Sequence, residues 1–156
     1  MPYSNPPDDR IRQLLTDART IAIAGASSNP DKASYGIMQK LQSVGYKVIP
    51  INPREASVLG ERAYPTLSDV PEPVDIVDVF RRPEDTPAIA DEAVAIGAKA
   101  LWLQTGIVSD EAAARAEAGG LLVVMDQCIA ATHTLLGVGR RSASSGQAEA
   151  GTDRTL

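Results

Sequence analysis

A loop that begins with glycine carries the first group of residues that could bind a ligand. The apolar run at residues 20–24 ends at Gly25, and the segment that follows contains two adjacent serines and a lysine before the next helix. Backbone N–H groups at the start of a helix, hydroxyl groups and a lysine ammonium group all attract a phosphate. The residues predicted for this phosphate-binding loop are Gly25, Ala26, Ser27, Ser28, Lys32 and Tyr35.

The loop differs from the glycine pattern of dinucleotide-binding domains. In that pattern a second glycine stands two residues after the first, and here position 27 is a serine. A structural interpretation is also open, in which Gly25 only turns the chain and Ser34 only caps the following helix. Neither role requires Ser27, Ser28 or Lys32, so the loop is predicted to bind phosphate.

The end of the second predicted strand indicates which kind of nucleotide is bound. Domains that bind NAD usually place an acidic residue there, which accepts hydrogen bonds from the ribose hydroxyls. Here the strand is followed by Asn52, Pro53 and Arg54. An arginine pairs well with a phosphate on the ribose, which NADP and coenzyme A (CoA) carry and NAD lacks. Arg54 therefore favours NADP or CoA, unless it is an ordinary exposed arginine of the loop.

Two further strand ends are expected to border the same crevice, because ligands of open parallel sheets bind beyond the carboxyl ends of the strands. Phe80 and Arg81 follow one strand, and Gln104 ends the next. Phe80 is predicted to pack on the ligand, Arg81 to neutralise phosphate and Gln104 to bond an amide. Each also has a structural alternative: a core aromatic, a surface arginine and a polar residue that caps a strand.

No group of residues has the spacing of a catalytic or metal site. Asp75 and Asp78 are three residues apart on one predicted strand, so their side chains point to opposite faces. Cys128 and His133 are five residues apart, which is more than one helical turn. They are the one cysteine and the one histidine of the chain, which excludes an internal disulfide and a cluster of such ligands. The sequence therefore predicts no catalytic and no metal-binding residues, and it favours a binding protein over an enzyme.

Strands and helices alternate along the chain, and these elements must position the residues above. Continuous apolar runs indicate buried parallel strands, and helical spacing between them indicates crossover helices. Pro50 fits poorly in an interior strand because it lacks an N–H donor. The expected strands are residues 20–24, 47–51, 62–64, 74–80, 100–104 and 121–125, and the expected helices lie near residues 9–17, 34–44, 83–96, 109–118 and 129–135. The predicted fold class is α/β, a single domain with a three-layer, Rossmann-like, doubly wound and mostly parallel sheet.

Composition limits the domain and its partners. The chain has 156 residues, 44% of them hydrophobic, which suits one domain with a full core. Residues 1–8 are expected to be a polar lead-in, residues 9–139 the domain, and residues 140–156 a disordered tail with few large apolar side chains. The net charge of −5 argues against nucleic acid as a partner. No signal peptide or membrane-spanning run is evident, so no membrane association and a cytoplasmic location are expected.

The chain also resembles a known family. From about residue 11 to residue 138 it resembles the small stand-alone CoA-binding proteins, which are relatives of the nucleotide-binding domain of the succinyl-CoA synthetase alpha subunit. The matching stretches are residues 25–36, 45–53, 74–82, 102–106 and 125–129, in order along the structured chain. The resemblance implies a Rossmann-like fold with CoA bound across the first loop and the end of the second strand.

Through this resemblance the ligand contacts of the family fall on three groups of residues. They are Gly25, Ala26, Ser27, Ser28 and Lys32 in the phosphate loop, Asn52, Pro53 and Arg54 beside the adenosine, and Phe80 and Gln104 along the pantetheine arm. Two positions depart from the pattern, since Glu55 stands where the synthetase has a lysine and Gln127 where these small proteins have an arginine. The synthetase domain with the phosphorylated histidine has no counterpart here, so ligase chemistry does not carry over.

Three functional hypotheses follow. The first is a protein that binds CoA or an acyl-CoA without chemistry of its own, as a sensor, a carrier or a detached subunit. The second is an NADP-linked oxidoreductase, which the broken glycine pattern and the missing proton donors disfavour. The third is a protein-interaction scaffold whose pocket is a relic.

Overall fold

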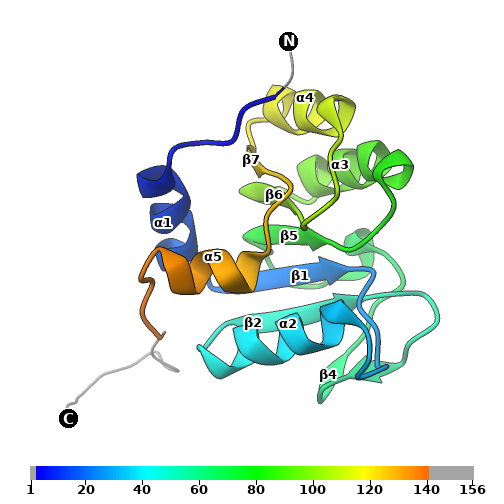
Figure 1. Cartoon of the computed structure of the whole chain (residues 1–156). Helices are drawn as coiled ribbons and strands as arrows, with labels where there is room; N and C mark the ends of the chain where they lie inside the picture. Colours follow the sequence, from blue (N-terminus) through cyan, green and yellow to red (C-terminus); the bar gives the residue numbers. More distant parts are fainter. Residues whose placement is uncertain (1–2, 141–156) are drawn as a thin grey trace.

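Five parallel strands form the central sheet of the computed structural model, which describes residues 3–140. They are β1 (Thr20–Ala24), β2 (Lys47–Ile51), β5 (Ile76–Val79), β6 (Ala100–Leu103) and β7 (Leu122–Val124). Their order across the sheet is β2-β1-β5-β6-β7, and every pair of neighbours is parallel. The predicted α/β class with a doubly wound, Rossmann-like sheet is therefore confirmed (Figure 1). Apart from residue 140, the predicted tail lies outside the described residues.

Helices cover both faces of this sheet (Figure 1). One face carries α1 (Asp8–Asp17), α2 (Ala33–Ser43) and α5 (Ile129–Leu135), and the other carries α3 (Thr86–Ala95) and α4 (Asp110–Ala118). Alternate strand residues belong to alternate cores. Ile21 and Ile23 of β1 are buried beneath the first group of helices, whereas Ala22 and Ala24 are buried beneath the second. Because both faces are covered, the strands are apolar on both sides.

Pro50 lies in β2, an outer strand of the sheet, where a missing N–H donor costs little. Its carbonyl oxygen accepts a hydrogen bond from Tyr64 N at 3.1 Å, and Tyr64 also forms an isolated bridge with Ile51. A small antiparallel hairpin, β3 (Ser57–Val58) and β4 (Glu61–Arg62), precedes this bridge. Only part of the segment expected to be a strand, residues 62–64, is a strand in the structure. The other strand of the hairpin, β3, was not predicted.

The neighbouring strands β1 and β5 mark the point where the chain changes direction across the sheet. From β1 the chain passes through α2 to β2, and from β5 it passes through α3 to β6 on the other side. The loops that leave β1 and β5 therefore diverge, which in sheets of this kind leaves a crevice at the carboxyl edge. This edge is where a ligand is expected.

The segment before α1 is attached to the last strand of the sheet. Tyr3 donates its hydroxyl to the carbonyl oxygen of Val123 at 2.6 Å. Asn5 exchanges two hydrogen bonds of 2.9 Å with the backbone of Met125, one as donor and one as acceptor. Two residues of the expected lead-in, Tyr3 and Asn5, therefore contact the sheet along β7.

Candidate functional site

Three strand ends meet at Gly25. Gly25 N donates to the carbonyl oxygen of Ile51 at 3.0 Å, and Phe80 N donates to that of Ala24 at 2.8 Å. Gly25 has a φ of +91°, and a Cβ atom at this position would lie 2.5 Å from the carbonyl oxygen of Phe80. This close approach requires glycine, so the end of β1 lies directly against the end of β5 where the loop predicted to bind phosphate begins.

The phosphate-binding loop is braced by its own polar groups. Ser27 Oγ accepts a hydrogen bond from Asn29 N at 3.0 Å, and Asn29 Oδ1 accepts one from Asp31 N at 2.9 Å. Lys32 N donates to the carbonyl oxygen of Asn29 at 3.0 Å. Among residues 3–140, the N–H groups of Ala26 and Ser27 have no acceptor, so they can be offered to an anion.

The start of α2 follows this loop immediately. Lys32 is the N-cap residue, and no side chain caps the helix. The structural interpretation in which Ser34 caps this helix is therefore wrong, because Ser34 is buried within the first turn, with 4% of its surface exposed. Tyr35 is half-buried and packs against the core beneath α2. The uncapped helix end adds further backbone N–H groups and the positive end of the helix dipole to the site.

Asn52 joins the loop after β2 to the phosphate-binding loop. Its Nδ2 donates to the carbonyl oxygen of Ala26 at 2.7 Å, and its Oδ1 accepts from Arg54 N at 2.9 Å. Pro53 and Arg54 are exposed. Among residues 3–140, neither Arg54 nor Lys32 takes part in an ion pair. The residues predicted beside the adenosine therefore lie next to the phosphate-binding loop, with two cations free to bind an anion.

Glu55 also lies in the site, although the sequence marks it only as a departure from the related synthetases. Its Oε2 accepts hydrogen bonds from Ser28 N at 2.8 Å and from Ser28 Oγ at 2.9 Å. Glu55 is half-buried, in contrast to the exposed Arg54. The structure thus places the acidic residue, rather than the arginine, on the phosphate-binding loop. No local pattern predicts this contact, because it joins residues that are 27 positions apart.

Phe80 and Arg81 border the loop from the β5 side. Phe80 is half-buried and packs against the core beneath α2 and α5. Arg81 forms an ion pair with Asp85 at 3.4 Å, and its Cδ atom would lie 3.0 Å from a Cβ on Gly25. Both residues are thus adjacent to the loop as predicted from strand order, but the Arg81 charge is shared with Asp85.

A narrow pocket of about 70 Å³ opens between these strand ends and α3. Besides Gly25, Pro53 and Arg81, its lining contains residues that the sequence did not predict: Thr66, Leu67, Ile89 and Glu92. Thr66 and Leu67 belong to the 3-10 turn η1 (Leu67–Asp69) and its cap, and their position depends on how the chain returns to the sheet after β4. Small-molecule sites typically measure roughly 300–1,000 Å³, so this pocket alone is too small to enclose a nucleotide.

Gln104 is buried and engaged inside the protein. Its Nε2 donates to Asp78 Oδ1 at 2.5 Å, and 3% of the Gln104 surface is exposed. Asp78 is fully buried in β5, and its Oδ2 has no hydrogen-bond partner among the described residues. Burial raises the pKa of Asp78 to about 8, although the hydrogen bond from Gln104 acts in the opposite direction. The NH₂ group of the Gln104 side chain therefore already makes a hydrogen bond within the sheet.

The residues considered for catalysis do not come together. Asp75 lies at the opposite end of β5, where it accepts two backbone hydrogen bonds. His133 is buried and packs edge-to-face on Tyr46, with ring centroids 5.8 Å apart. Burial, helped by the Lys40 charge, lowers the pKa of His133. In the described part of the chain Cys128 and His133 share no hydrogen bond, and no three His, Cys, Asp or Glu residues are grouped as metal ligands would be.

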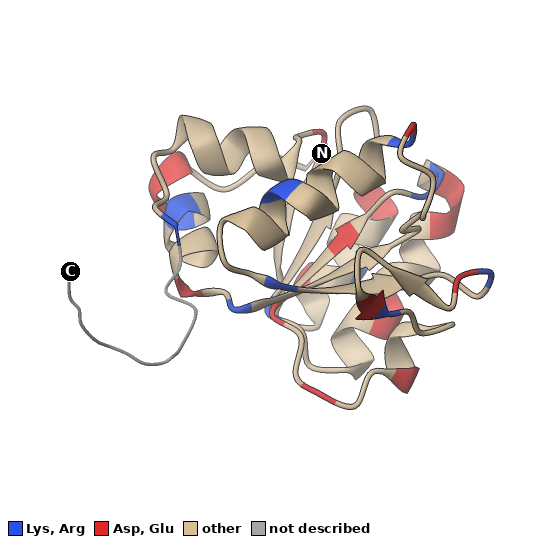
Figure 2. Ribbon diagram, turned by 90° about the horizontal axis from the view of Figure 1, so that it is seen from below, with Lys and Arg blue, Asp and Glu red and all other residues tan. Residues whose placement is uncertain are grey.

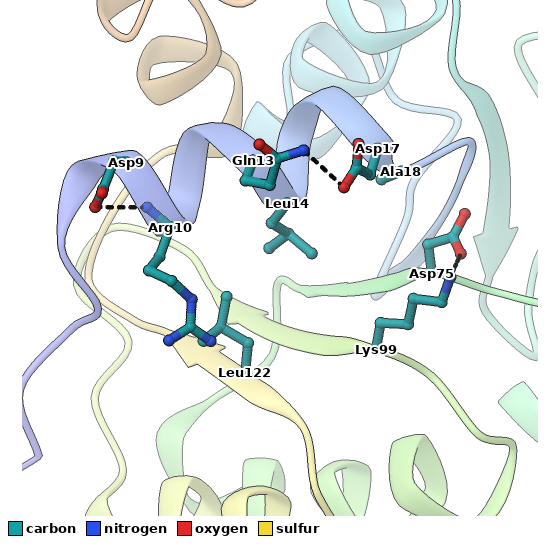
Figure 3. A pocket seen from close by; sticks show the side chains of 9 residues that line it. All are labelled: Asp9, Arg10, Gln13, Leu14, Asp17, Ala18, Asp75, Lys99 and Leu122. Carbon is teal, nitrogen blue, oxygen red and sulfur yellow. Dashed lines mark hydrogen bonds and ion pairs between the residues drawn. The ribbon is translucent and has the colours of Figure 1, made fainter.

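A much larger pocket, about 440 Å³ in volume, lies at the opposite edge of the sheet (Figure 3). Helix α1 forms one wall, and residues at the starts of β5, β6 and β7 form the other. Its acidic residues, Asp9, Asp17 and Asp75, all accept hydrogen bonds from within the protein. The larger volume thus favours this pocket as the ligand site, whereas the direction of the strands favours the carboxyl edge. We favour the carboxyl edge, because the unused backbone donors and the helix N-terminus converge there.

Charged residues are dispersed over the surface. Figure 2 shows Lys and Arg positions on several elements, with Asp and Glu positions between them. The described residues contain no helix that is both long and apolar enough to span a bilayer.

Known proteins of similar length resemble this chain over most of their sequence. The sequence profile of a family described as a CoA binding domain matches residues 19–134. The uncharacterized protein YneT of Bacillus subtilis is 37% identical over 131 residues, which is 84% of this chain and 97% of that protein. The structure of a hypothetical protein from Pyrococcus horikoshii OT3 is 34% identical and superposes with a TM-score of 0.82, covering 87% of this chain and 99% of that one.

Parts of longer enzymes are also similar. An ADP-forming acetate–CoA ligase of Methanocaldococcus jannaschii is 28% identical over 98 residues, which is 63% of this chain but 14% of the ligase. An acetyl-coenzyme A synthetase of Ca. Korarchaeum cryptofilum is 30% identical with a TM-score of 0.63, over 71% of this chain and 26% of that one. This chain thus corresponds to one part of these enzymes. The profile match, the similarity to YneT and the shared fold show that the chain belongs to the family of CoA-binding domains.

Proposed function

We propose that this protein binds CoA or an acyl-CoA across the carboxyl edge of its sheet. The observation that carries the proposal is the junction at Gly25, where the unused N–H groups of Ala26 and Ser27 and the uncapped start of α2 lie at the point between β1 and β5. Backbone donors arranged in this way suit a phosphate. Membership in the family of CoA-binding domains favours CoA over other phosphate compounds.

Two cations would set the orientation of the bound ligand. Lys32 lies at the start of α2 and Arg54 after β2, and both are exposed. A pyrophosphate group close to Gly25 and a 3′-phosphate close to Arg54 would use both charges. The pantetheine arm would then pass Phe80 toward the ends of β6 and β7, along the remaining carboxyl edge.

We propose that binding is the whole function of this chain, in the role of a sensor, a carrier or a detached subunit of the cytoplasm. Covalent catalysis needs a nucleophile that a nearby base activates. In the described residues the buried His133 is engaged with Tyr46 and makes no hydrogen bond to Cys128. The ligases to which the chain is similar are several times longer, and their activity is not carried over.

Ligand preference provides the first test. Bound ligand raises the midpoint of thermal unfolding, and the rise grows with affinity at a fixed ligand concentration. We expect CoA to raise the melting temperature more than NADP or NAD at equal concentration. An equal or larger rise with NADP would support the oxidoreductase instead.

The 3′-phosphate provides a second arm of the same experiment. If Arg54 pairs with it, dephospho-CoA binds more weakly than CoA by about 1.5–3 kcal/mol, the value of a hydrogen bond to a charged group. Calorimetry with Arg54→Ala should then show similar affinities for the two ligands. Arg19→Ala is the matched control, because it removes the same charge from an exposed position before β1, at the opposite edge. An unchanged preference in Arg54→Ala would remove Arg54 from the site.

A further inference from the structure

Glu55 holds hydrogen-bond donors that a phosphate would use. Its Oε2 receives both the backbone N–H and the hydroxyl of Ser28, at 2.8 and 2.9 Å. Ser28 belongs to the loop that begins at Gly25, and it directly follows Ala26 and Ser27 in the chain, whose N–H groups have no acceptor among the described residues. A carboxylate oxygen that receives an N–H and an O–H in this way resembles one oxygen of a bound phosphate.

The backbone directs Glu55 toward the loop. Glu55 N donates to the carbonyl oxygen of Asn52 at 3.3 Å, which closes a tight turn after β2. Asn52 is itself fixed to the loop through its hydrogen bond to Ala26. The same turn leaves Arg54 exposed, so two adjacent residues of opposite charge point to different surroundings.

We propose that Glu55 is a specificity-determining residue, whose carboxylate occupies the place of a ligand phosphate on Ser28 and competes with phosphorylated ligands. This inference rests on the proposed binding of CoA at the carboxyl edge. Two anions cannot share the Ser28 N–H and hydroxyl, and two negative charges a few ångströms apart repel each other even in a partly solvated site. A phosphorylated ligand must therefore displace Glu55, which lowers its affinity, whereas a ligand without phosphate is unaffected.

The test compares Glu55→Gln with the parent protein by isothermal titration calorimetry. Glutamine has the same shape and no charge, so its hold on Ser28 is weaker. Glu72→Gln is the matched control, because Glu72 is exposed, makes no ion pair among the described residues and gives the same change in net charge. The ligands are CoA, which carries phosphates, pantetheine, which carries none, and inorganic pyrophosphate.

We expect Glu55→Gln to bind CoA and pyrophosphate about tenfold more tightly than the parent, as when one charged competitor is removed. Glu72→Gln should stay within about twofold, the scale of a remote surface charge, and no variant should change the affinity for pantetheine. The proposal would be overturned if Glu55→Gln bound CoA and pyrophosphate with the same affinities as the parent does. Weaker CoA binding by Glu55→Gln would also overturn it, since Glu55 would then contact the ligand, for example through the ribose hydroxyls.

Failure of the proposed function gives a different result. If the parent and both variants bind no CoA, then the CoA site itself is wrong. The pyrophosphate titration still decides the role of Glu55 in that case, because pyrophosphate needs only the donors of the loop. Tighter pyrophosphate binding by Glu55→Gln would support competition at Ser28, and equal or undetectable binding in all three proteins would overturn it.

Discussion

The carboxyl group of Asp78 links the stability of the protein to pH. The pKa of Asp78 is about 8 in the folded protein because of burial, against a usual value of 3.8. Between these two values the folded protein holds a proton that the unfolded chain releases. The contribution of protonated Asp78 to the free energy of unfolding is thus fully present below about pH 4. It is lost as the pH rises to about 8, and the free energy of unfolding falls by at most about 1.4 kcal/mol per pH unit.

The substitution Asp78→Asn should remove this dependence. Relative to the variant, the parent should lose free energy of unfolding between pH 5 and pH 8, as measured by urea denaturation at each pH. The lowered pKa of His133 has the opposite effect, since its stabilisation is lost as the pH falls, but it is common to both proteins and cancels in the difference. Glu72→Gln should follow the parent. Parallel curves for Asp78→Asn and the parent would mean that Asp78 is ionised in the folded state.

At the scale of residues, the sequence predicted positions better than partners. Residue type and order along the chain placed Gly25, Arg54 and Phe80 at strand ends, and the structure has them there. The pairing of Gln104 with Asp78 depends on the register of β5 against β6, and a single sequence does not report that register. The contact of Glu55 with Ser28 depends on how two loops meet in space.

At the scale of elements, the close contact between β1 and β5 predicts opposite effects for two glycines. Gly25→Ala places a Cβ 2.5 Å from the carbonyl oxygen of Phe80 at a φ of +91°. We expect a loss of more than about 2 kcal/mol of unfolding free energy, because both the backbone conformation and the contact are unfavourable. Urea denaturation measures this loss.

Gly36 is the matched position. It lies within α2, and a Cβ there would have no neighbour within 4 Å. Gly36→Ala should therefore stabilise the protein by about 0.5–1 kcal/mol, the helix-forming advantage of alanine over glycine. Little or no loss in Gly25→Ala would mean that the tight approach of β1 to β5 does not exist in solution.

Element positions were predictable because apolar runs and glycines punctuate this chain clearly. The last helix matches its prediction at both ends, residues 129–135, and the helix expected near residues 109–118 begins at its cap Ser109, which accepts from Ala112 N. The start of α2 was not predictable, because Ser34 has the residue type of a cap but the chain turns two residues earlier, at Lys32. The hairpin of β3 and β4 has strands of two residues each, too short for any periodicity.

At the scale of the whole molecule, Asn5 attaches the beginning of the described chain to its last strand. Asn5→Ala removes two hydrogen bonds of 2.9 Å and leaves the N–H and carbonyl groups of Met125 without this partner. We expect a loss of about 1–3 kcal/mol of unfolding free energy. Ser4→Ala, at an exposed neighbouring position, should change it by less than about 0.5 kcal/mol. An unchanged free energy of unfolding in Asn5→Ala, or a loss in Ser4→Ala as large as in Asn5→Ala, would show that these two hydrogen bonds do not stabilise the protein.

The same attachment has a consequence for self-association. An open sheet exposes unpaired backbone groups along both outer strands, and these recruit strands from other chains, which leads to aggregation. Here Tyr3 and Asn5 occupy backbone groups of Val123 and Met125 along β7. On the other side Tyr64 bonds to β2, where Pro50 offers no N–H. Backbone groups at both borders of the sheet are thus occupied, which disfavours association of copies of this chain by strand addition there.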